Sequence, residues 1–196
     1  MASTSLSRTN TTTSSNRKTG TFSAWVKRSS IASGNGGIIT AYIDSNNHTV
    51  IYFDGSSQLC YLEQQSGSTE SFVRTTRLFR DTSAWYHIVV SIDATQSTAS
   101  NRVKFYVNGA QETALNSTNY PSDTTLNIFG NSSPLKVGED TTGSPHYFSG
   151  SMSHIHFIDG TAYDATAFGE TDANGVWKIK TSPSVTYGTN GFFILK

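Results

Sequence analysis

The sequence predicts an all-β fold in which two antiparallel sheets pack as a sandwich. Residues 85–109 carry the main observation: apolar side chains alternate along 86–92 and again along 103–107, which gives each of two strands one apolar side. The second strand ends in Asn108-Gly109, a pair that readily takes the positive φ values of a tight hairpin turn. Turn-forming residues recur roughly every 8 to 15 positions, a spacing typical of a sandwich and not of βαβ units.

The same reasoning assigns strands along the rest of the chain. In order, we expect them at 21–27, 38–43, 49–53, 58–63, 71–79, 85–93, 102–107, 110–113, 126–129, 135–137 and 147–158. Residues 1–19 are rich in Ser, Thr and Asn and form either an N-terminal arm or a first edge strand around Leu6. Because no internal repeat or linker follows, residues 20–196 are expected to form a single domain.

Two local patterns refine this prediction. In 21–27 the residues Phe22, Ala24 and Val26 share one face while Trp25 occupies the other, so both faces of this strand should be covered. Only 164–169 has helical features, since Asp164 is a suitable N-cap and Gly169 a suitable stop. We expect one short helical turn there.

Composition limits the possible functions. The 196 residues include 14 Lys and Arg against 14 Asp and Glu, so the formal net charge is zero and no basic excess supports nucleic-acid binding. A net charge near zero reduces the electrostatic repulsion between copies of a protein, and this favours a protein that works as part of an assembly. The N-terminus has no secretory pattern and no apolar run could insert in a membrane. The lone Cys60 cannot form an intramolecular disulfide and is expected to be a small buried hydrophobe.

Three strings carry a resemblance to a known family. The segments 22–27 (FSAWVK), 85–90 (WYHIVV) and 105–109 (FYVNG) resemble a core strand, a central strand and a hairpin of laminin-G-like, concanavalin A-like jelly-roll domains. Residues 135–138 (LKVG) and 148–150 (FSG) are similar to the late part of that pattern. The resemblance spans roughly residues 20–160 and implies that the predicted sandwich is a jelly roll.

The C-terminal third resembles a narrower group. Residues 156–162, 168–172, 175–178 and 187–191, with the closing FFIL, are similar to laminin-G-like domains in virion proteins of tailed phages, particularly marine ones. This resemblance implies a structural or adhesive virion protein.

No catalytic site is predicted. A retaining glycosidase of this superfamily needs two carboxylates about 5 Å apart, and the nearest string, 170–175 (ETDANG), lacks a final acid and contains turn residues. His154 and His156 are two positions apart and would point the same way on a strand, but a zinc site needs a third ligand. Polar residues on a half-buried strand are the favoured interpretation of this pair.

Calcium is the one ion that the loops could hold, because some laminin-G-like domains bind it at the rim of the sandwich with Asp and backbone oxygens. Asp44 and Asp140 are weak candidates among the acids at strand ends. The alternative is that these acids form ordinary turns. No other cofactor is expected.

Binding through loops is the remaining chemistry. Amides and a Tyr ring suit the hydroxyls and apolar faces of sugars, so we name Asn46, Asn47, His48, Asn119 and Tyr120 as candidate glycan-binding residues. The same residues could instead form polar loops that bind no ligand.

The sequence thus favours a non-enzymatic phage virion protein exposed on the particle surface, assembled in the host cytoplasm as a capsid decoration, fibre or tail-fibre module. It would form homo-oligomers in the assembly, dock to other virion proteins and contact host-surface polysaccharide weakly. The alternatives are a carbohydrate-active hydrolase of the same fold and a cellular glycan-binding lectin or adhesion module.

Overall fold

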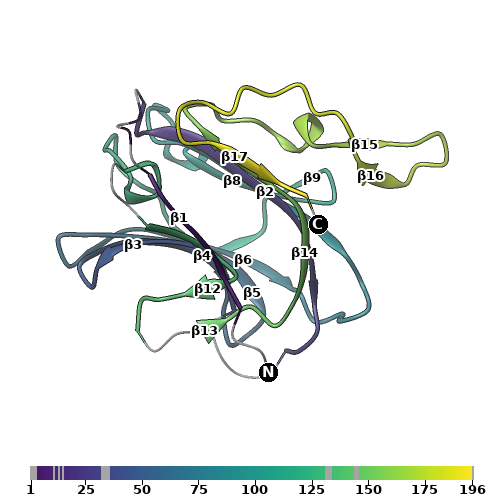
Figure 1. Cartoon of the computed structure of the whole chain (residues 1–196), viewed down its shortest axis with the longest axis horizontal. Helices are drawn as coiled ribbons and strands as arrows, with labels where there is room; N and C mark the ends of the chain where they lie inside the picture. Colours follow the sequence, from purple (N-terminus) through teal and green to yellow (C-terminus); the bar gives the residue numbers. More distant parts are fainter. Residues whose placement is uncertain are drawn as a thin grey trace.

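Two large antiparallel sheets face each other in the computed structural model of the protein, which describes residues 4–10, 12, 14, 16–31, 36–130, 134–143 and 146–195 (Figure 1). The larger sheet has the order β1 (Leu6–Thr9), β11 (Pro134–Val137), β3 (Gly36–Asp44), β4 (Asn47–Phe53), β5 (Gln58–Gln65), β6 (Ser68–Leu78) and β10 (Leu115–Asn119). Two short strands, β12 (Glu139–Asp140) and β13 (His146–Tyr147), attach beside β3.

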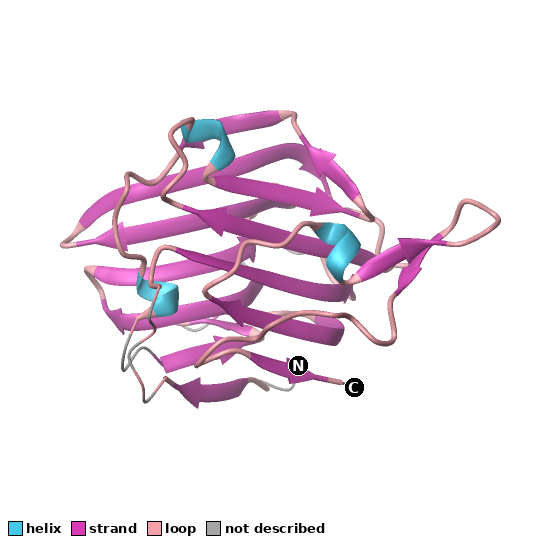
Figure 2. Cartoon of the chain, turned by 90° about the horizontal axis from the view of Figure 1, so that it is seen from above, coloured by secondary structure: helices cyan, strands magenta, loops and turns pink. Residues whose placement is uncertain are grey.

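The smaller sheet has the order β17 (Phe192–Ile194), β14 (Gly150–Asp159), β2 (Thr19–Arg28), β7 (Tyr86–Asp93), β8 (Val103–Val107) and β9 (Ala110–Glu112). A separate hairpin of β15 (Gly169–Thr171) and β16 (Trp177–Ile179) projects from the body of the molecule (Figure 2). Three short 3₁₀ helices complete the described elements: η1 (Ala99–Asn101), η2 (Asn127–Phe129) and η3 (Ala165–Ala167). The predicted all-β, two-sheet architecture is confirmed.

The main core lies between the two sheets, and the alternating residues build it. From the smaller sheet, Phe22, Ile88 and Phe105 are almost completely buried, and they belong to the same cluster as Phe53 and Tyr61 of the larger sheet. Because side chains alternate along each strand, every strand of this core also presents a second set of residues to the outside of the sandwich.

The predicted β8–β9 turn has the expected geometry. Asn108 and Gly109 have φ values of 49° and 84°, and the hydrogen bond from the Asn108 N–H to His87 O fixes the turn to β7. A Cβ atom at Gly109 would lie 2.5 Å from the indole ring of Trp177, so only glycine fits this position.

One predicted strand is wrong. Residues 126–129 do not form a strand: η2 covers Asn127–Phe129, and Ile128 and Phe129 are buried in the main core. A short apolar run cannot by periodicity alone be distinguished from another buried element. The predicted helical turn is confirmed as η3, whose N-cap Asp164 accepts a hydrogen bond from the Thr166 N–H.

The strand expected over 147–158 is divided in the structure. β13 ends at Tyr147 and β14 begins at Gly150, and β14 shifts register against β2 between Ser153 and His156. His154 lies in this bulge with a φ of 47°, a left-handed conformation that costs a non-glycine residue free energy. A β-bulge cannot be read from simple alternation.

The C-terminal segment covers the outer side of the smaller sheet and forms a second core there (Figure 1). Val89 and Ile158 of the sheet pack against Ala165 and Phe168, and Trp177 packs at the margin of this cluster. The outward Thr21 and Ser23 of strand 21–27 are completely buried, and the Thr21 hydroxyl donates to Thr161 O at 2.9 Å, so both faces of this part of the strand are covered as expected. Trp25 is half-buried and stacks on His87 of the adjacent strand at 5.0 Å between ring centroids.

His87 connects this segment to the sheet. Its Nδ1 accepts a 3.0 Å hydrogen bond from the Trp177 indole N–H, and because an indole can only donate, the proton of the neutral imidazole sits on Nε2, facing Ser23 Oγ at 2.9 Å. Burial, with smaller contributions from His156 and His154, lowers the pKa of His87 to about 3. The ring is therefore a neutral structural element.

Candidate functional site

The outer face of the larger sheet collects aromatic, amide and charged side chains on adjacent strands. Residues 49, 51 and 53 of β4 point into the sandwich, so residues 48, 50 and 52 point outward, and the register extends this face across β5, β6 and β10. We use "outer face" for Tyr42, His48, Val50, Tyr52, Cys60, Leu62, Gln64, Phe72, Arg74 and Asn119.

The central row of the outer face crosses four strands. Val50 pairs with Leu62, Leu62 with Phe72, and Phe72 with Asn119. Val50 is buried, Leu62 and Phe72 are half-buried, and Asn119 is exposed. The row therefore places an accessible aromatic ring between an aliphatic side chain and an exposed amide.

The adjacent row carries Tyr52, Cys60 and Arg74. Arg74 donates a 2.7 Å hydrogen bond from Nε to Asn116 Oδ1, and its guanidinium lies 5.5 Å from the centre of the Phe72 ring. A weaker ion pair of 3.5 Å joins it to Asp54. These contacts hold a cation and an aromatic ring side by side on the face.

Burial sets the pKa values of the Tyr52 hydroxyl and the Cys60 thiol in this row. It is the main cause that raises the pKa of Tyr52 well above its ordinary value and that of the Cys60 thiol to about 12. Cys60 is fully buried and protonated, as expected for a small hydrophobe and unlike a reactive thiolate.

The five predicted glycan-binding residues fall into three locations. His48 and Asn119 belong to the outer face, although His48 is almost completely buried and stacks on Tyr42 with 6.1 Å between ring centroids. Asn46 and Asn47 lie at the β3–β4 turn, at one end of the larger sheet. Tyr120 follows β10 and packs against the main core, and burial raises the pKa of its hydroxyl.

Asn47 is occupied by internal contacts. Its Nδ2 donates to both carboxylate oxygens of Asp44, at 3.0 and 3.2 Å, and its Oδ1 accepts from the Ser66 N–H at 3.1 Å. The Gly67 N–H bonds to Asn46 O at 3.0 Å, so the β3–β4 and β5–β6 turns lie together. Asn47 is best described as a structural link between the two turns.

Asn119 keeps a more available amide. Its Nδ2 reaches the carbonyl oxygens of Thr69 and Glu70 only at 3.5 Å each, the limit of a hydrogen bond. The side chain is exposed beside the β5–β6 hairpin, which separates it from Asn46 and Asn47. Of the predicted residues, Asn119 is the one best placed to meet a ligand on the outer face.

The two calcium candidates do not come together. Asp44 ends β3, whereas Asp140 lies against Gly37 near the start of β3, a separation of roughly 20 Å at about 3.3 Å per residue. Asp44 accepts from the Asn46 N–H, the main cause that lowers the pKa of its carboxyl, and Asp140 accepts from the N–H and hydroxyl of Thr142. Both have the contacts of turn acids.

His154 and His156 likewise make structural contacts. His156 Nδ1 lies 2.9 Å from the Tyr187 hydroxyl, and its ring stacks on Phe193 with 4.5 Å between ring centroids. His154 Nδ1 lies 2.8 Å from Ser153 Oγ, and its ring is tilted against Phe193 with 6.2 Å between centroids. Burial lowers the pKa of His156 to about 4. Within the described residues, no group of three or more His, Cys, Asp or Glu side chains is arranged to hold a metal ion.

Glu63 lies on the core side of the same turns and was missed by the sequence reasoning. It is completely buried and accepts hydrogen bonds from the Thr49 hydroxyl, the Asn127 N–H at 2.8 Å and Gln65 Nε2 at 3.0 Å. Burial outweighs these donors and raises the pKa of Glu63 to about 7. The carboxyl joins β4 and β5 to η2 beneath the end of the outer face.

Other residues of the outer face were also missed, chiefly Tyr52, Phe72 and Arg74. A signal for them exists in the alternation: they occupy the positions between the core-facing residues of β4 and β6. Sequence reasoning concentrated on loops and assigned no function to the outward side chains of strands.

Comparisons with solved structures show the same fold in an arabinanase domain, a pentraxin and a phage tailspike. Domain 4 of the extracellular arabinanase AbnA from Geobacillus stearothermophilus, solved with arabinotriose, is 20% identical with a TM-score of 0.53 over 74% of this chain and 63% of that one. The heptameric SAP-like pentraxin of Limulus polyphemus is 17% identical with a TM-score of 0.52 over 74% of this chain and 65% of that one. The enzymatically active domain of bacteriophage CBA120 tailspike protein 2 is 14% identical with a TM-score of 0.54 over 84% of this chain and 25% of that one.

At these identities the likeness is one of fold, and the aligned part is less than two thirds of each of these three proteins. No curated protein sequence matches the chain. In the described part of the chain, no helix is long and apolar enough to cross a membrane. A family model, Laminin_G_3 of the concanavalin A-like lectin/glucanases superfamily, matches residues 2–167, most of the sequence. The protein therefore belongs to this superfamily, whose jelly-roll fold is one used for carbohydrate binding.

Proposed function

We propose that the protein is a non-enzymatic surface component of a tailed-phage virion that binds glycans weakly through the outer face of its larger sheet. The observation that carries glycan binding is the row Leu62, Phe72 and Asn119, which places an aromatic ring beside an exposed amide. A sugar ring offers C–H groups to an aromatic face and hydroxyls to an amide. Arg74, held beside Phe72, adds donors for hydroxyl or carboxylate groups.

The sheet is a suitable base for such a site. Side chains on paired strands are positioned more rigidly than side chains on loops, so little conformational freedom is lost when a ligand binds. A single shallow face binds weakly, and the many copies on a particle would convert weak contacts into useful avidity. This agrees with a capsid decoration, a fibre or a tail-fibre module that is present in repeated copies.

The carboxylates that border the outer face support a binding role over catalysis. Asp54 accepts from the N–H groups of Ser56 and Gln58 and pairs with Arg74, and Glu70 accepts twice from Ser122. Both are committed to turns and loops. We expect no release of reducing sugar from marine polysaccharides, and release that is lost on mutation of Asp54 or Glu70 would establish the hydrolase instead.

The virion assignment rests on the resemblance of residues 156–191 to phage virion domains and on the neutral, motif-poor chain. Its test is mass spectrometry of purified particles together with the symmetry of their surface features. We expect the chain at stoichiometric abundance, in a symmetric assembly with neighbouring virion proteins. A monomeric protein that is absent from particles would contradict the assignment.

The glycan site is tested by screening the purified protein on a glycan array and titrating the best ligand. Asn119→Ala and Phe72→Leu should each weaken binding by about fivefold, the loss of roughly 1 kcal/mol. Gln111→Ala, an exposed amide on β9 of the smaller sheet, is the matched control and should leave binding unchanged. Equal affinities for all three variants would place the ligand elsewhere.

A further inference from the structure

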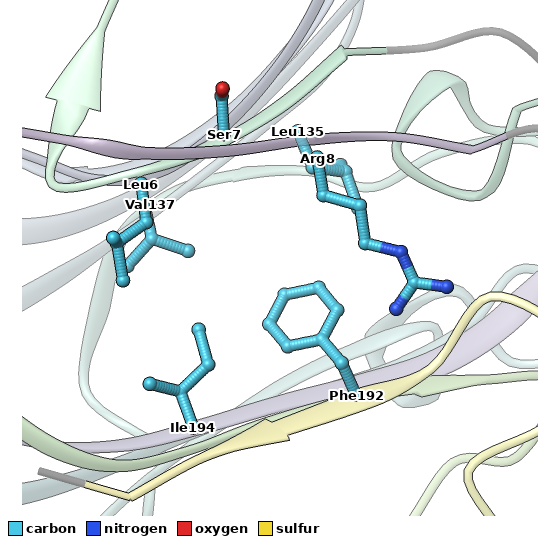
Figure 3. A pocket seen from close by; sticks show the side chains of 7 residues that line it. All are labelled: Leu6, Ser7, Arg8, Leu135, Val137, Phe192 and Ile194. Atoms are coloured by element: carbon cyan, nitrogen blue, oxygen red, sulfur yellow. The ribbon is translucent and has the colours of Figure 1, made fainter.

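The two sheets leave an open side where the edge strands β1 and β17 face each other (Figure 3). β1 is the last strand of the larger sheet, and all four of its residues are exposed. β17 is the last strand of the smaller sheet. Phe193 in its middle is 44% exposed, and Leu195, which directly follows it, is 64% exposed. In the described part of the chain, neither strand has a partner on its outer side.

An apolar cleft of about 160 Å³ lies between these two edges. The described residues that line it come from β1, β11 and β17: Leu6, Ser7, Arg8, Leu135, Val137, Phe192 and Ile194. Figure 3 shows Leu6 and Val137 on one side of the cleft and Phe192 and Ile194 on the other, while Ser7 points away from it. An apolar cavity of about 150 Å³ is large enough to hold a benzene molecule, so this cleft has room for one or two aliphatic side chains.

Arg8 supplies the only charge among the residues that line the cleft. Its guanidinium lies 5.6 Å from the centre of the Phe192 ring and donates one long hydrogen bond of 3.4 Å to Gly191 O. No acid is among the described residues that line the cleft. A guanidinium has five N–H donors, and within the described part of the chain this one donates a single long hydrogen bond at the cleft.

We infer that this open side is a docking site for an extended peptide segment of another protein, one that alternates apolar residues with polar ones and carries an acidic residue. We infer an acidic residue in the partner peptide from charge complementarity, because its carboxylate can form a charge-assisted pair with Arg8. We infer an extended conformation for the peptide from the exposed edge of β1, since an added strand would pair with the unpaired backbone groups of that edge.

The alternation follows from strand geometry. Side chains on one side of the added strand enter the cleft against Leu6, Val137 and Ile194, and those on the other side face water. The site deepens the proposed attachment to other virion proteins by naming a surface and a partner chemistry. It lies apart from the outer face and does not depend on glycan binding.

The experiment uses the purified full chain and a fluorescent peptide, acetyl-Val-Thr-Leu-Thr-Asp-Thr-amide, in which Val, Leu and Asp share one side. Control peptides replace Asp by Lys or move Leu to the opposite side. We expect the Asp peptide to bind about tenfold more tightly than the Lys peptide, and Arg8→Glu to reverse that preference. Hydrogen exchange at residues 6–9 should slow when the Asp peptide binds.

Arg80→Glu is the matched control, because Arg80 is an exposed arginine away from the cleft. Leu6→Ser, at a residue that is 52% exposed, should weaken binding without loss of folding. Equal weakening by Arg8→Glu and Arg80→Glu would overturn the proposal, as would binding of decanoate but of no peptide. A dimer of the protein alone that Arg8→Glu dissociates would also overturn it, by showing that a second copy fills the cleft. These readouts do not involve particles, so their failure is distinguishable from failure of the virion assignment.

Discussion

Replacing the buried carboxyl of Glu63 by an amide should remove a pH dependence from the stability of the protein. Glu63 has an ordinary pKa of 4.5, and burial raises the pKa to about 7 in the folded protein. Below about pH 4.5 the group is protonated in both the folded and the unfolded state, so folding carries no ionisation cost. Above pH 7 it is ionised in both states, and the folded state bears the full cost of the buried charge.

The stability contributed by the neutral acid is therefore complete below pH 4.5 and is lost as the pH rises through about 7. The interval between these two pKa values corresponds to about 3 kcal/mol, since each tenfold change in proton affinity is worth about 1.4 kcal/mol. In Glu63→Gln the amide oxygen can still accept from Asn127 and Gln65, and Nε2 can donate to the Thr49 hydroxyl.

The assay is urea unfolding of the wild type and Glu63→Gln at several pH values between about 4.5 and 8. The variant should gain up to about 3 kcal/mol over the wild type as the pH rises, because its own stability lacks this titration. The buried His87 and His156 also titrate, but they are present in both proteins and cancel in the difference. Glu170→Gln, an exposed acid on β15, is the control and should show no such trend. A difference between wild type and Glu63→Gln that stays constant across this range would refute the reasoning.

Three further predictions concern the C-terminal segment and its anchors. Trp177→Ala should lower the free energy of unfolding by about 3 kcal/mol, because it removes a packed ring and the hydrogen-bond donor to His87. It should also speed amide hydrogen exchange across 163–187, and unchanged exchange would contradict this role of Trp177. Gly109→Ala should lower the stability measured by thermal unfolding by at least about 1 kcal/mol. The positive φ disfavours alanine, and the added Cβ atom would clash with the indole ring of Trp177. An unchanged stability would show that the indole ring moves away. Asp159→Ala should cost about 2 to 3 kcal/mol in urea unfolding, since the buried carboxylate accepts from the N–H and side-chain amide of Asn190, and Asp159→Asn should recover part of that loss.

Local patterns predict the strands whose faces differ strongly. β2, β7 and β8 alternate between core residues and outward residues, and the Asn108-Gly109 turn follows from the conformational freedom of those two residues alone. Alternation fails where both sides of a strand are polar and exposed. Apart from Leu115, which packs against the main core, β10 has this character and was not assigned. It forms because the edge of β6 offers it backbone partners.

Two other departures have different causes. Residues 126–129 are apolar enough for a strand, but they close one end of the sandwich as η2, where the Asn127 N–H bonds to Glu63. The bulge at His154 depends on the register of β14 against β2, which is a pairing between segments far apart in the chain. Neither can be derived from a window of neighbouring residues.

The sequence by itself determined the all-β class, the central strands and hairpin, and the covered second face of β2, because these follow from side-chain alternation and turn propensity within short segments. Only the tertiary structure decided which polar side chains meet. It tied Asn47 to Asp44 and Ser66, left Asn119 exposed beside Phe72, and separated Asp44 from Asp140 along β3. The raised pKa of Glu63 and the cleft at Arg8 also depend on it, because burial and strand order arise from contacts between residues that are distant in sequence.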